Sequence, residues 1–426
     1  KPCIAGVQDM KIDEKNKQVT VGNVTLKEGD WISMDGATGR VILGQAKLAK
    51  TGFDERVTTV LGWADEIRRL RVRTNADNPE DAKQAREFGA EGIGLCRTEH
   101  MFMQQERLPH VRNMIMAETT EEREKHLAKL LPFQREDFDG IFRAMAGLPV
   151  TIRLLDPPLH EFLPDYTEAM VELEKLRMNG ASAEAVASQE KMVATVKALA
   201  ESNPMLGTRG CRLGIQWPEI YAMQVRAILE AAADVFADTG EKPHVEIMIP
   251  LVGFEEELKR MRALTVETAD AVLKERGVQI DYTVGTMIEV PRAALTADEI
   301  ARQADFFSFG TNDLTQMTLG FSRDDAEGKF LTHYLKVDLL KSNPFEKLDQ
   351  TGVGQLVAMA VQKGRSVKPE LKTGICGEHG GEPTSVKFCH RTGLNYVSCS
   401  PYRVPLARLA AAQAVLEEKV AAKTGD

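Results

Sequence analysis

Short apolar segments alternate with amphipathic helical segments from residue 69 onward, and this alternation constrains the fold more than any other feature of the chain. Eight of the apolar segments have the length of a buried strand: 71–77, 91–96, 150–156, 245–251, 282–290, 304–310, 371–377 and 394–400. A weaker ninth strand is expected over 210–215, and the longest irregular stretch, a candidate mobile loop, over 320–348. Continuously apolar strands separated by helices are typical of a parallel sheet covered on both faces. Eight such strands favour a (β/α)8 TIM-type barrel, with a doubly wound open sheet as the alternative.

The first 46 residues have a different pattern. The stretch "KQVTVGNVTLKEGDWISMDGATGRVILG" places short Val-, Ile- and Leu-bearing strands between Asn, Asp and Gly turns, which predicts a small β-rich unit over 1–46. Residues 47–68 are predicted to form a helical linker, and 69–426 the barrel. A chain of 426 residues is too long for one ordinary core, which agrees with this division.

Composition excludes several classes of protein. The net charge of -9 does not favour nonspecific nucleic-acid binding, and no apolar run is long enough to span a bilayer. The six cysteines form no C-x-x-C pair, so neither a zinc knuckle nor a disulfide framework is indicated. A reducing, cytoplasmic location is therefore expected. The chain begins with Lys1 in the middle of a strand-like pattern, which suggests a fragment or a processed product and leaves a plastid location open.

Polar side chains stand at the carboxyl ends of most of the predicted strands, where parallel barrels place their active sites. They are Arg97, Arg153, Asp156, Arg209, Glu289, Thr311, Asn312, Asp313 and Cys376. Gly310 begins a Gly-Thr-Asn turn that is expected to supply backbone N–H donors for a carboxylate or phosphate. Arginines suit a ligand that carries phosphate and carboxylate groups, and two carboxylates, Glu289 and Asp313, suit a Mg²⁺ ion that keeps some of its waters. The Cys376 thiol can give or take a proton. A small anionic substrate, a divalent metal and a proton donor together indicate enolate chemistry.

Each of these residues also has a structural interpretation. A single strand-end arginine often pairs with a neighbouring carboxylate, and Asp156 is expected to orient an arginine in this way. His379 and His390 lie in no metal-ligand pattern and are expected to be structural. Four further cysteines are expected to behave as small hydrophobic residues: Cys96, Cys211, Cys389 and Cys399. The functional interpretation depends on the coincidence of complementary groups at successive strand ends.

Six segments carry a resemblance to a known family. They are "GIGLCRTEHMF", "RLLDPPLHEFLP", "NPMLGTRGCRLG", "GTMIEVPRAAL", "FFSFGTNDLTQMTLGFSRDD" and "GICGEHGG", and together they resemble the C-terminal half of the pyruvate phosphate dikinase family. The motif "SFGTNDLTQ" is shared with the wider phosphoenolpyruvate-utilising group, which includes phosphoenolpyruvate synthase and enzyme I of the sugar phosphotransferase system. "LLDPPLHEF" and "CGEHGG" point more narrowly to the dikinase family. The resemblance extends over essentially the whole chain.

This resemblance implies a role for each matching residue. Arg97, Arg153 and Arg209 correspond to arginines that bind the phosphate and carboxylate of the substrate, and Gly310, Thr311 and Asn312 to its substrate loop. Glu289 and Asp313 correspond to Mg²⁺ ligands that also contact the substrate. Cys376 corresponds to the catalytic acid/base that protonates the enolate at C3. The family's full enzyme, a homodimer, interconverts ATP, phosphate and pyruvate with AMP, diphosphate and phosphoenolpyruvate.

The family's phosphoryl-carrying histidine lies in a segment of the type T-S-H-x-A, and none of the eight histidines here has that context. Residues 1–46 are therefore expected to be the C-terminal remnant of a swivelling phosphohistidine domain, with the histidine before Lys1. That domain is the expected partner of the barrel. Two alternatives stay open: an enzyme I-like phosphotransferase that passes the phosphoryl group to a carrier protein, and a module that binds phosphoenolpyruvate without turnover.

Overall fold

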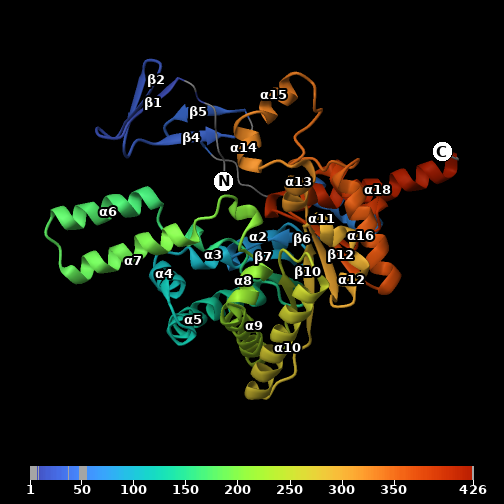
Figure 1. Cartoon of the computed structure of the whole chain (residues 1–426). Coiled ribbons are helices and arrows are strands. Elements are labelled where there is room, and N and C mark those ends of the chain that lie inside the picture. The colour runs from blue at the N-terminus through green and yellow to red at the C-terminus, as the bar shows by residue number, and fades with distance from the viewer. Residues whose placement is uncertain (1–6, 8, 37, 48–54, 425–426) are drawn as a thin grey trace. The chain divides into compact units, whose positions relative to one another are not determined.

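The computed structural model of the chain describes residues 7, 9–36, 38–47 and 55–424 (Figure 1). The chain divides into two compact units, residues 1–59 and 60–426, and the boundary between them falls within helix α1 (Glu55–Ile67). Of the expected helical linker 47–68, residues 48–54 lie outside the described part, and α1 occupies most of the remainder. Residues 1–6, which include Cys3, also lie outside it.

The first unit is β-rich, as its pattern predicts. Strands β1 (Met10–Asp13), β2 (Gln18–Val21) and β3 (Val24–Lys27) form an antiparallel sheet, and β4 (Ile32–Asp35) pairs with β5 (Arg40–Leu43) in a hairpin. Apolar side chains from both sheets line an open groove of about 750 Å³, among them Met10, Ile12, Ile32, Met34 and Leu43. All five side chains are exposed.

The second unit is a closed barrel of eight parallel strands. They are β6 (Arg71–Asn75), β7 (Ile93–Arg97), β8 (Pro149–Arg153), β9 (His244–Ile249), β10 (Tyr282–Ile288), β11 (Phe306–Gly310), β12 (Lys372–Cys376) and β13 (Tyr396–Cys399). The last strand closes on the first through the register Tyr396↔Arg71 to Cys399↔Thr74. The eight predicted strands and the TIM-type fold are thus confirmed, and closure excludes the open-sheet alternative.

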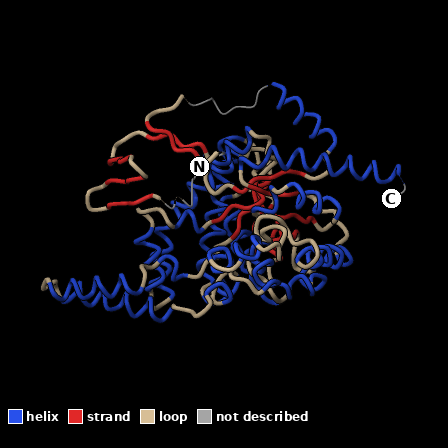
Figure 2. The backbone as a smooth tube through the Cα atoms, turned by 90° about the horizontal axis from the view of Figure 1, so that it is seen from above, coloured by secondary structure: helices blue, strands red, loops and turns tan. Residues whose placement is uncertain are grey.

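Helices surround the strands, as Figure 2 shows. The longer ones are α2 (Pro79–Glu87), α4 (Leu108–Met116), α5 (Thr120–Ala144), α6 (Tyr166–Met178), α7 (Ala183–Leu199), α9 (Pro218–Thr239), α10 (Glu255–Arg276), α13 (Thr311–Leu319), α16 (Val353–Val367), α17 (Pro383–Arg391) and α18 (Val404–Thr424). Short α-helices are α3 (Glu99–Phe102), α11 (Pro291–Leu295) and α12 (Ala297–Ala301), and 3-10 turns are η1 (Leu159–Phe162), η2 (Pro204–Leu206), η3 (Glu378–Gly381) and η4 (Pro401–Arg403). The α6–α7 hairpin extends away from the barrel. None of the described helices combines the length and the apolar content that would carry it through a lipid bilayer.

Two expectations about local structure are wrong. The segment 210–215 is not a strand, because α8 (Cys211–Gln216) occupies it. Gly210 has a φ of 57°, which turns the chain sharply after Arg209, and the next residues bury Cys211 and Leu213 from a helix. The stretch 320–348, expected to be irregular, contains α14 (Arg323–Gly328) and α15 (Leu331–Lys336). These helices enclose a small apolar cluster of Ala326, Leu331 and Phe345.

Inward-facing side chains fill the barrel in layers because every second residue of a strand points to the axis. At the amino-terminal end, Glu246 of β9 accepts from Arg73 of β6 at 2.8 Å and from Lys372 of β12 at 2.5 Å. Burial opposes the charge of Glu246, but Arg73 and Lys372 hold its pKa down at about 2. The next layer is apolar: Leu95, Met248, Met287, Phe306 and Cys376. The interior of the barrel is therefore packed with side chains.

Candidate functional site

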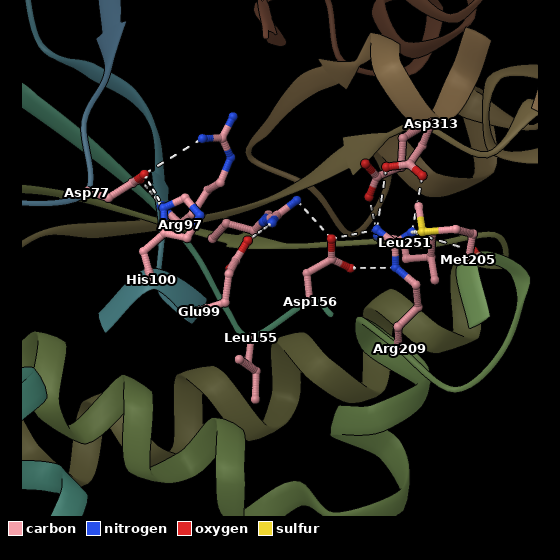
Figure 3. Close-up of polar contacts among 12 residues, drawn as sticks. Asp77, Arg97, Glu99, His100, Leu155, Asp156, Met205, Arg209, Leu251 and Asp313 are labelled. Carbon is pink, nitrogen blue, oxygen red and sulfur yellow. Dashed lines mark hydrogen bonds and ion pairs between the residues drawn. The ribbon is translucent and has the colours of Figure 1, made fainter. Parts of the chain in front are cut away.

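The predicted site residues gather at the carboxyl end of the barrel, and Figure 3 shows Arg97, Asp156, Arg209 and Asp313 among them. Arg97 ends β7 beside Arg153 of β8, and Gly310 ends β11 beside Cys376 of β12. Glu289 directly follows β10, and Arg209 comes from the loop between η2 and α8. Thr311, Asn312 and Asp313 form the first turn of α13, so the expected Gly-Thr-Asn turn is the beginning of a helix. The backbone N–H groups of a first helical turn lack intrahelical acceptors and can bind an anion.

Two of the three arginines are held by buried carboxylates. Arg153 pairs with Glu99 and, through Nη1, with Asp156 at 2.8 Å. Arg209 donates to Asp156 Oδ2 at 2.6 Å and pairs with Asp313 Oδ1 at 3.1 Å. Burial alone would raise the pKa of Asp156, but the two guanidinium groups keep it below its ordinary value. Asp156 therefore orients both arginines, which extends the expectation that it orients one.

Glu289 is a buried carboxylate whose charged form the site disfavours. Its side chain is fully buried, and Oε1 accepts the backbone N–H of Leu251 at 2.6 Å. Leu251 has a φ of 61°, an unfavourable conformation for a leucine, which brings that N–H to the carboxylate. Oε2 has no hydrogen-bond partner among the residues that the structure describes. Burial, with repulsion from Asp313 and Asp156, raises the pKa of Glu289 to about 8.

The surroundings of Glu289 fit a divalent cation. A cation near Glu289 and Asp313 would relieve their repulsion and give the unpartnered Oε2 a ligand. No group of three or more His, Cys, Asp or Glu side chains suited to a metal occurs in the described part of the chain. An ion held by two carboxylates would complete its coordination with water and substrate oxygens, which is typical of Mg²⁺.

Gly310 leaves the space that the Glu289 carboxylate occupies. A Cβ atom at position 310 would lie 2.4 Å from Glu289 Oε2 and 2.6 Å from Met287 Cε. We expect Gly310→Ala to displace the carboxylate and weaken the binding of Mg²⁺ about tenfold or more. Calorimetric titration of Mg²⁺ measures this effect. Gly328→Ala is the matched control because no atom lies within 4 Å of its added Cβ. Equal metal dependence in both variants would contradict the prediction.

Cys376 lies in the apolar layer directly below the polar mouth. Its thiol donates to the carbonyl oxygen of Phe309 at 3.6 Å, and its side chain is 3% exposed. Burial raises the pKa of the thiol to about 11, although the neighbouring Ser308 hydroxyl opposes the shift. Cys376 is therefore a protonated thiol at neutral pH, which is the form a proton donor needs.

The buried His379 was expected to be structural, and its contacts tie it to Thr311 at the start of α13. Nε2 lies 2.8 Å from the carbonyl oxygen of Pro344, which can only accept, so Nε2 carries the proton. Nδ1 then accepts from the Thr311 hydroxyl at 2.7 Å. Burial lowers the pKa of His379, which keeps the ring neutral. The imidazole thus joins Thr311 to the segment that contains α14 and α15.

We expect His379→Ala to lower the free energy of unfolding by about 2–3 kcal/mol, because two buried hydrogen bonds are lost. Chemical denaturation measures the change. The depressed pKa has a further consequence: the stability contributed by neutral His379 is lost as pH falls through its folded-state pKa. This part of the acid dependence is expected to be absent from His379→Gln. An unchanged acid dependence in that variant would contradict the assignment.

Several neighbours of the predicted residues were not recognised as part of the site from the sequence. Arg323 donates to Asn312 Oδ1 at 3.0 Å and pairs with Glu378 at 3.2 Å, so it links the first turn of α13 to the turn after Cys376. The contact of the Leu251 backbone N–H with Glu289 was also not predicted, because nothing in the local sequence indicates the backbone conformation of Leu251. The strand-end motif "CRTE" did contain Glu99, but no local signal pairs it with Arg153 across 54 positions.

The chain is thus a (β/α)8 protein whose barrel holds arginines, acidic residues and a buried thiol at its carboxyl end. Residues 53–416 match the family model "PEP-utilising enzyme, PEP-binding domain", and the chain belongs to this family.

Named relatives narrow the comparison. The chain is 56% identical over 416 residues to "Pyruvate, phosphate dikinase 1, chloroplastic" of Arabidopsis thaliana, covering 98% of this chain and 42% of the relative. It is 54% identical over 417 residues to "Pyruvate, phosphate dikinase" of Clostridium symbiosum, covering 98% of this chain and 47% of the relative. The chain thus spans less than half the length of these relatives and matches their C-terminal part.

Proposed function

We propose that this chain performs the phosphoenolpyruvate/pyruvate half of a pyruvate phosphate dikinase reaction. The observation that carries the proposal is the convergence of Glu289, Asp313 and the arginines above the buried thiol of Cys376. In this half-reaction, the phosphoryl group passes between phosphoenolpyruvate and a histidine outside this chain. The enolate of pyruvate is the other product, and protonation at C3 completes the reaction.

The arginines supply complementary charge for the substrate. Arg153 and Arg209 are buried, and their carboxylate partners hold the guanidinium planes in place, so they bind substrate oxygens at little cost in side-chain entropy. Arg97 is more accessible, at 34% exposed, and its ion pair with Asp77 is long, at 3.7 Å. It is therefore the arginine most available to an incoming phosphate. The N–H groups at the start of α13 provide further donors.

Glu289 and Asp313 would hold Mg²⁺. When bound, the ion supplies electrostatic stabilisation of the negative charge that develops on the enolate oxygen. Arg153 and Arg209 contribute to the same stabilisation from fixed positions. Binding of the ion also requires Glu289 to lose the proton that its raised pKa retains at neutral pH.

Cys376 is the proposed proton donor. When the P–O bond of phosphoenolpyruvate breaks, a P–N bond forms to the histidine and the enolate remains. The S–H bond of Cys376 then breaks as a C–H bond forms at C3, which leaves pyruvate and a thiolate. In the reverse direction, the thiolate removes a methyl proton from pyruvate. A module that only binds phosphoenolpyruvate would not need this thiol.

The other half of the parent reaction is assigned to domains outside this chain. We infer that the β-rich unit belongs to a swivelling phosphohistidine domain, and that the parent enzyme is a homodimer that uses ATP and phosphate. The apolar groove between its two small sheets supports the first part, because exposed apolar surface of this kind normally packs against further polypeptide.

Calorimetric titration of phosphoenolpyruvate into the chain, first with Mg²⁺ and then with EDTA, tests the proposal. We expect binding that depends on the metal. Binding of equal strength in EDTA would remove Glu289 and Asp313 from the substrate site. No binding under either condition would contradict the proposal for this chain.

A further inference from the structure

The accessible arginine of the site, Arg97, has a carboxylate partner with three contacts. Asp77 lies between β6 and α2 and faces the end of β7, as Figure 3 shows. Its Oδ1 accepts the backbone N–H of Arg97 at 2.6 Å. Its Oδ2 lies 3.7 Å from Arg97 Nη1 and 2.7 Å from Nδ1 of His100. One carboxylate therefore fixes the Arg97 backbone and is shared between a guanidinium group and an imidazole.

This arrangement determines which nitrogen of His100 titrates. A carboxylate only accepts hydrogen bonds, so Nδ1 carries a proton in the neutral and the charged ring alike. The titrating proton is therefore on Nε2, and the side chain is 51% exposed, which gives it access to solvent. The charged groups that act on His100 are Asp77 between β6 and α2, Arg97 at the end of β7 and Glu99 on its own helix. The hydrogen bond to Asp77 is the largest effect and raises the pKa of His100.

We propose that Asp77 and His100 are positioning residues for Arg97, and that protonation of His100 strengthens the binding of a phosphate-like anion to Arg97. The proposal rests on the assignment of Arg97 to substrate binding. With neutral His100, the charge of Asp77 is directed at Arg97 and partly cancels it. With protonated His100, that charge is shared with a second cation, and the site attracts an anion more strongly. Among the described residues, no histidine is hydrogen-bonded to the carboxylate partners of Arg153 and Arg209, and those partners are buried.

Sulfate is the probe of choice, because it resembles phosphate and its charge does not change between about pH 6 and about pH 8, the range in which histidine titrates. Calorimetric titrations of the full chain in EDTA compare the two pH values. We expect sulfate to bind wild-type protein about threefold more tightly at the lower pH, the scale of a partly exposed charge interaction. His100→Asn keeps a donor near Nδ1 but has no titration, so it is expected to lose this threefold part of the pH dependence and to keep only the part that the titration of Glu289 contributes. His333→Asn, on exposed α15, is the control that keeps the wild-type dependence.

Two further measurements separate positioning from a structural role. Asp77→Asn keeps an acceptor for the Arg97 N–H and removes the charge, so we expect tight sulfate binding at both pH values. By linkage, sulfate must also raise the pKa of His100 in wild-type protein, which NMR of the imidazole measures without any variant. The His100 signal is identified by its loss in His100→Asn.

Three results would overturn the proposal: no sulfate binding to the wild-type protein, unchanged binding in Arg97→Gln, or an unchanged pH dependence in His100→Asn. The EDTA titrations keep this test apart from the proposed function. If the sulfate linkage holds and phosphoenolpyruvate with Mg²⁺ does not bind, the substrate assignment is wrong and the pair stands as an anion-responsive element. If phosphoenolpyruvate binds with Mg²⁺ but the sulfate linkage is absent, only the positioning role of Asp77 and His100 is contradicted.

Discussion

Replacing Cys376 by alanine is expected to lower exchange of the pyruvate methyl protons with solvent about 100-fold or more, while phosphoenolpyruvate affinity stays within severalfold. The thiol lies below the polar mouth and contributes a proton to C3, but it is not among the charged groups that bind the substrate. Loss of methyl proton signal from pyruvate in D₂O, with Mg²⁺ present, measures the exchange by NMR. Cys389→Ala, a buried cysteine of α17, is the matched control. Exchange that continues unchanged in Cys376→Ala would remove the thiol from the mechanism.

The raised pKa of the thiol adds a pH dependence to this result. Removal of a proton from pyruvate requires the thiolate, and a pKa of about 11 makes the thiolate scarce at neutral pH. The exchange rate of the wild-type protein should therefore rise as pH increases from neutral to alkaline values. The residual rate in Cys376→Ala should lack this rise. A wild-type rate that falls in the same range would contradict the role of Cys376 as the base.

Glu289→Gln is expected to abolish Mg²⁺-dependent binding of phosphoenolpyruvate, because one of two metal carboxylates becomes a neutral amide. Titrations with Mg²⁺ and with EDTA should give the same weak affinity in this variant. Glu346→Gln, at an exposed position, should behave as wild type. If Glu289→Gln keeps the wild-type metal dependence, the cation lies elsewhere.

Glu289 also predicts that metal binding releases a proton. With a pKa of about 8, its carboxyl group is mostly protonated at pH 7, and a bound cation requires the charged form. Calorimetry of the wild-type protein near pH 7 in buffers of different ionisation enthalpy should show release of about one proton. In the unfolded chain Glu289 ionises near its ordinary pKa of 4.5, whereas in the folded chain it stays protonated up to about 8. The metal-free wild type should therefore lose more stability than Glu289→Gln as pH rises from about 4.5 to about 8, and the difference should level off above that range.

Much of the fold follows from local pattern. The eight barrel strands are recognisable because each is a short apolar run that ends at polar or glycine residues. Such a run can be identified from residues that are adjacent in the sequence. The exceptions are instructive. Segment 210–215 contains enough apolar residues for a strand, but the left-handed turn at Gly210 and the burial of Cys211 and Leu213 favour a helix. In 320–348 the local sequence has no clear helical periodicity. Packing of Leu331 against Phe345 in the folded chain stabilises the short helices there.

The strand pattern alone predicts the barrel and the residues at its mouth, because a parallel barrel brings all strand ends to one face whatever the details of packing. It does not predict the ion-pair partners or the protonation states of those residues. Arg209 pairs with Asp313 across 104 positions and Asp77 with His100 across 23, and only the folded chain brings them together. The burial of Glu289 and its unpartnered oxygen likewise arise from distant segments. Desolvation and charge proximity, which set protonation and metal affinity, are properties of the tertiary structure alone.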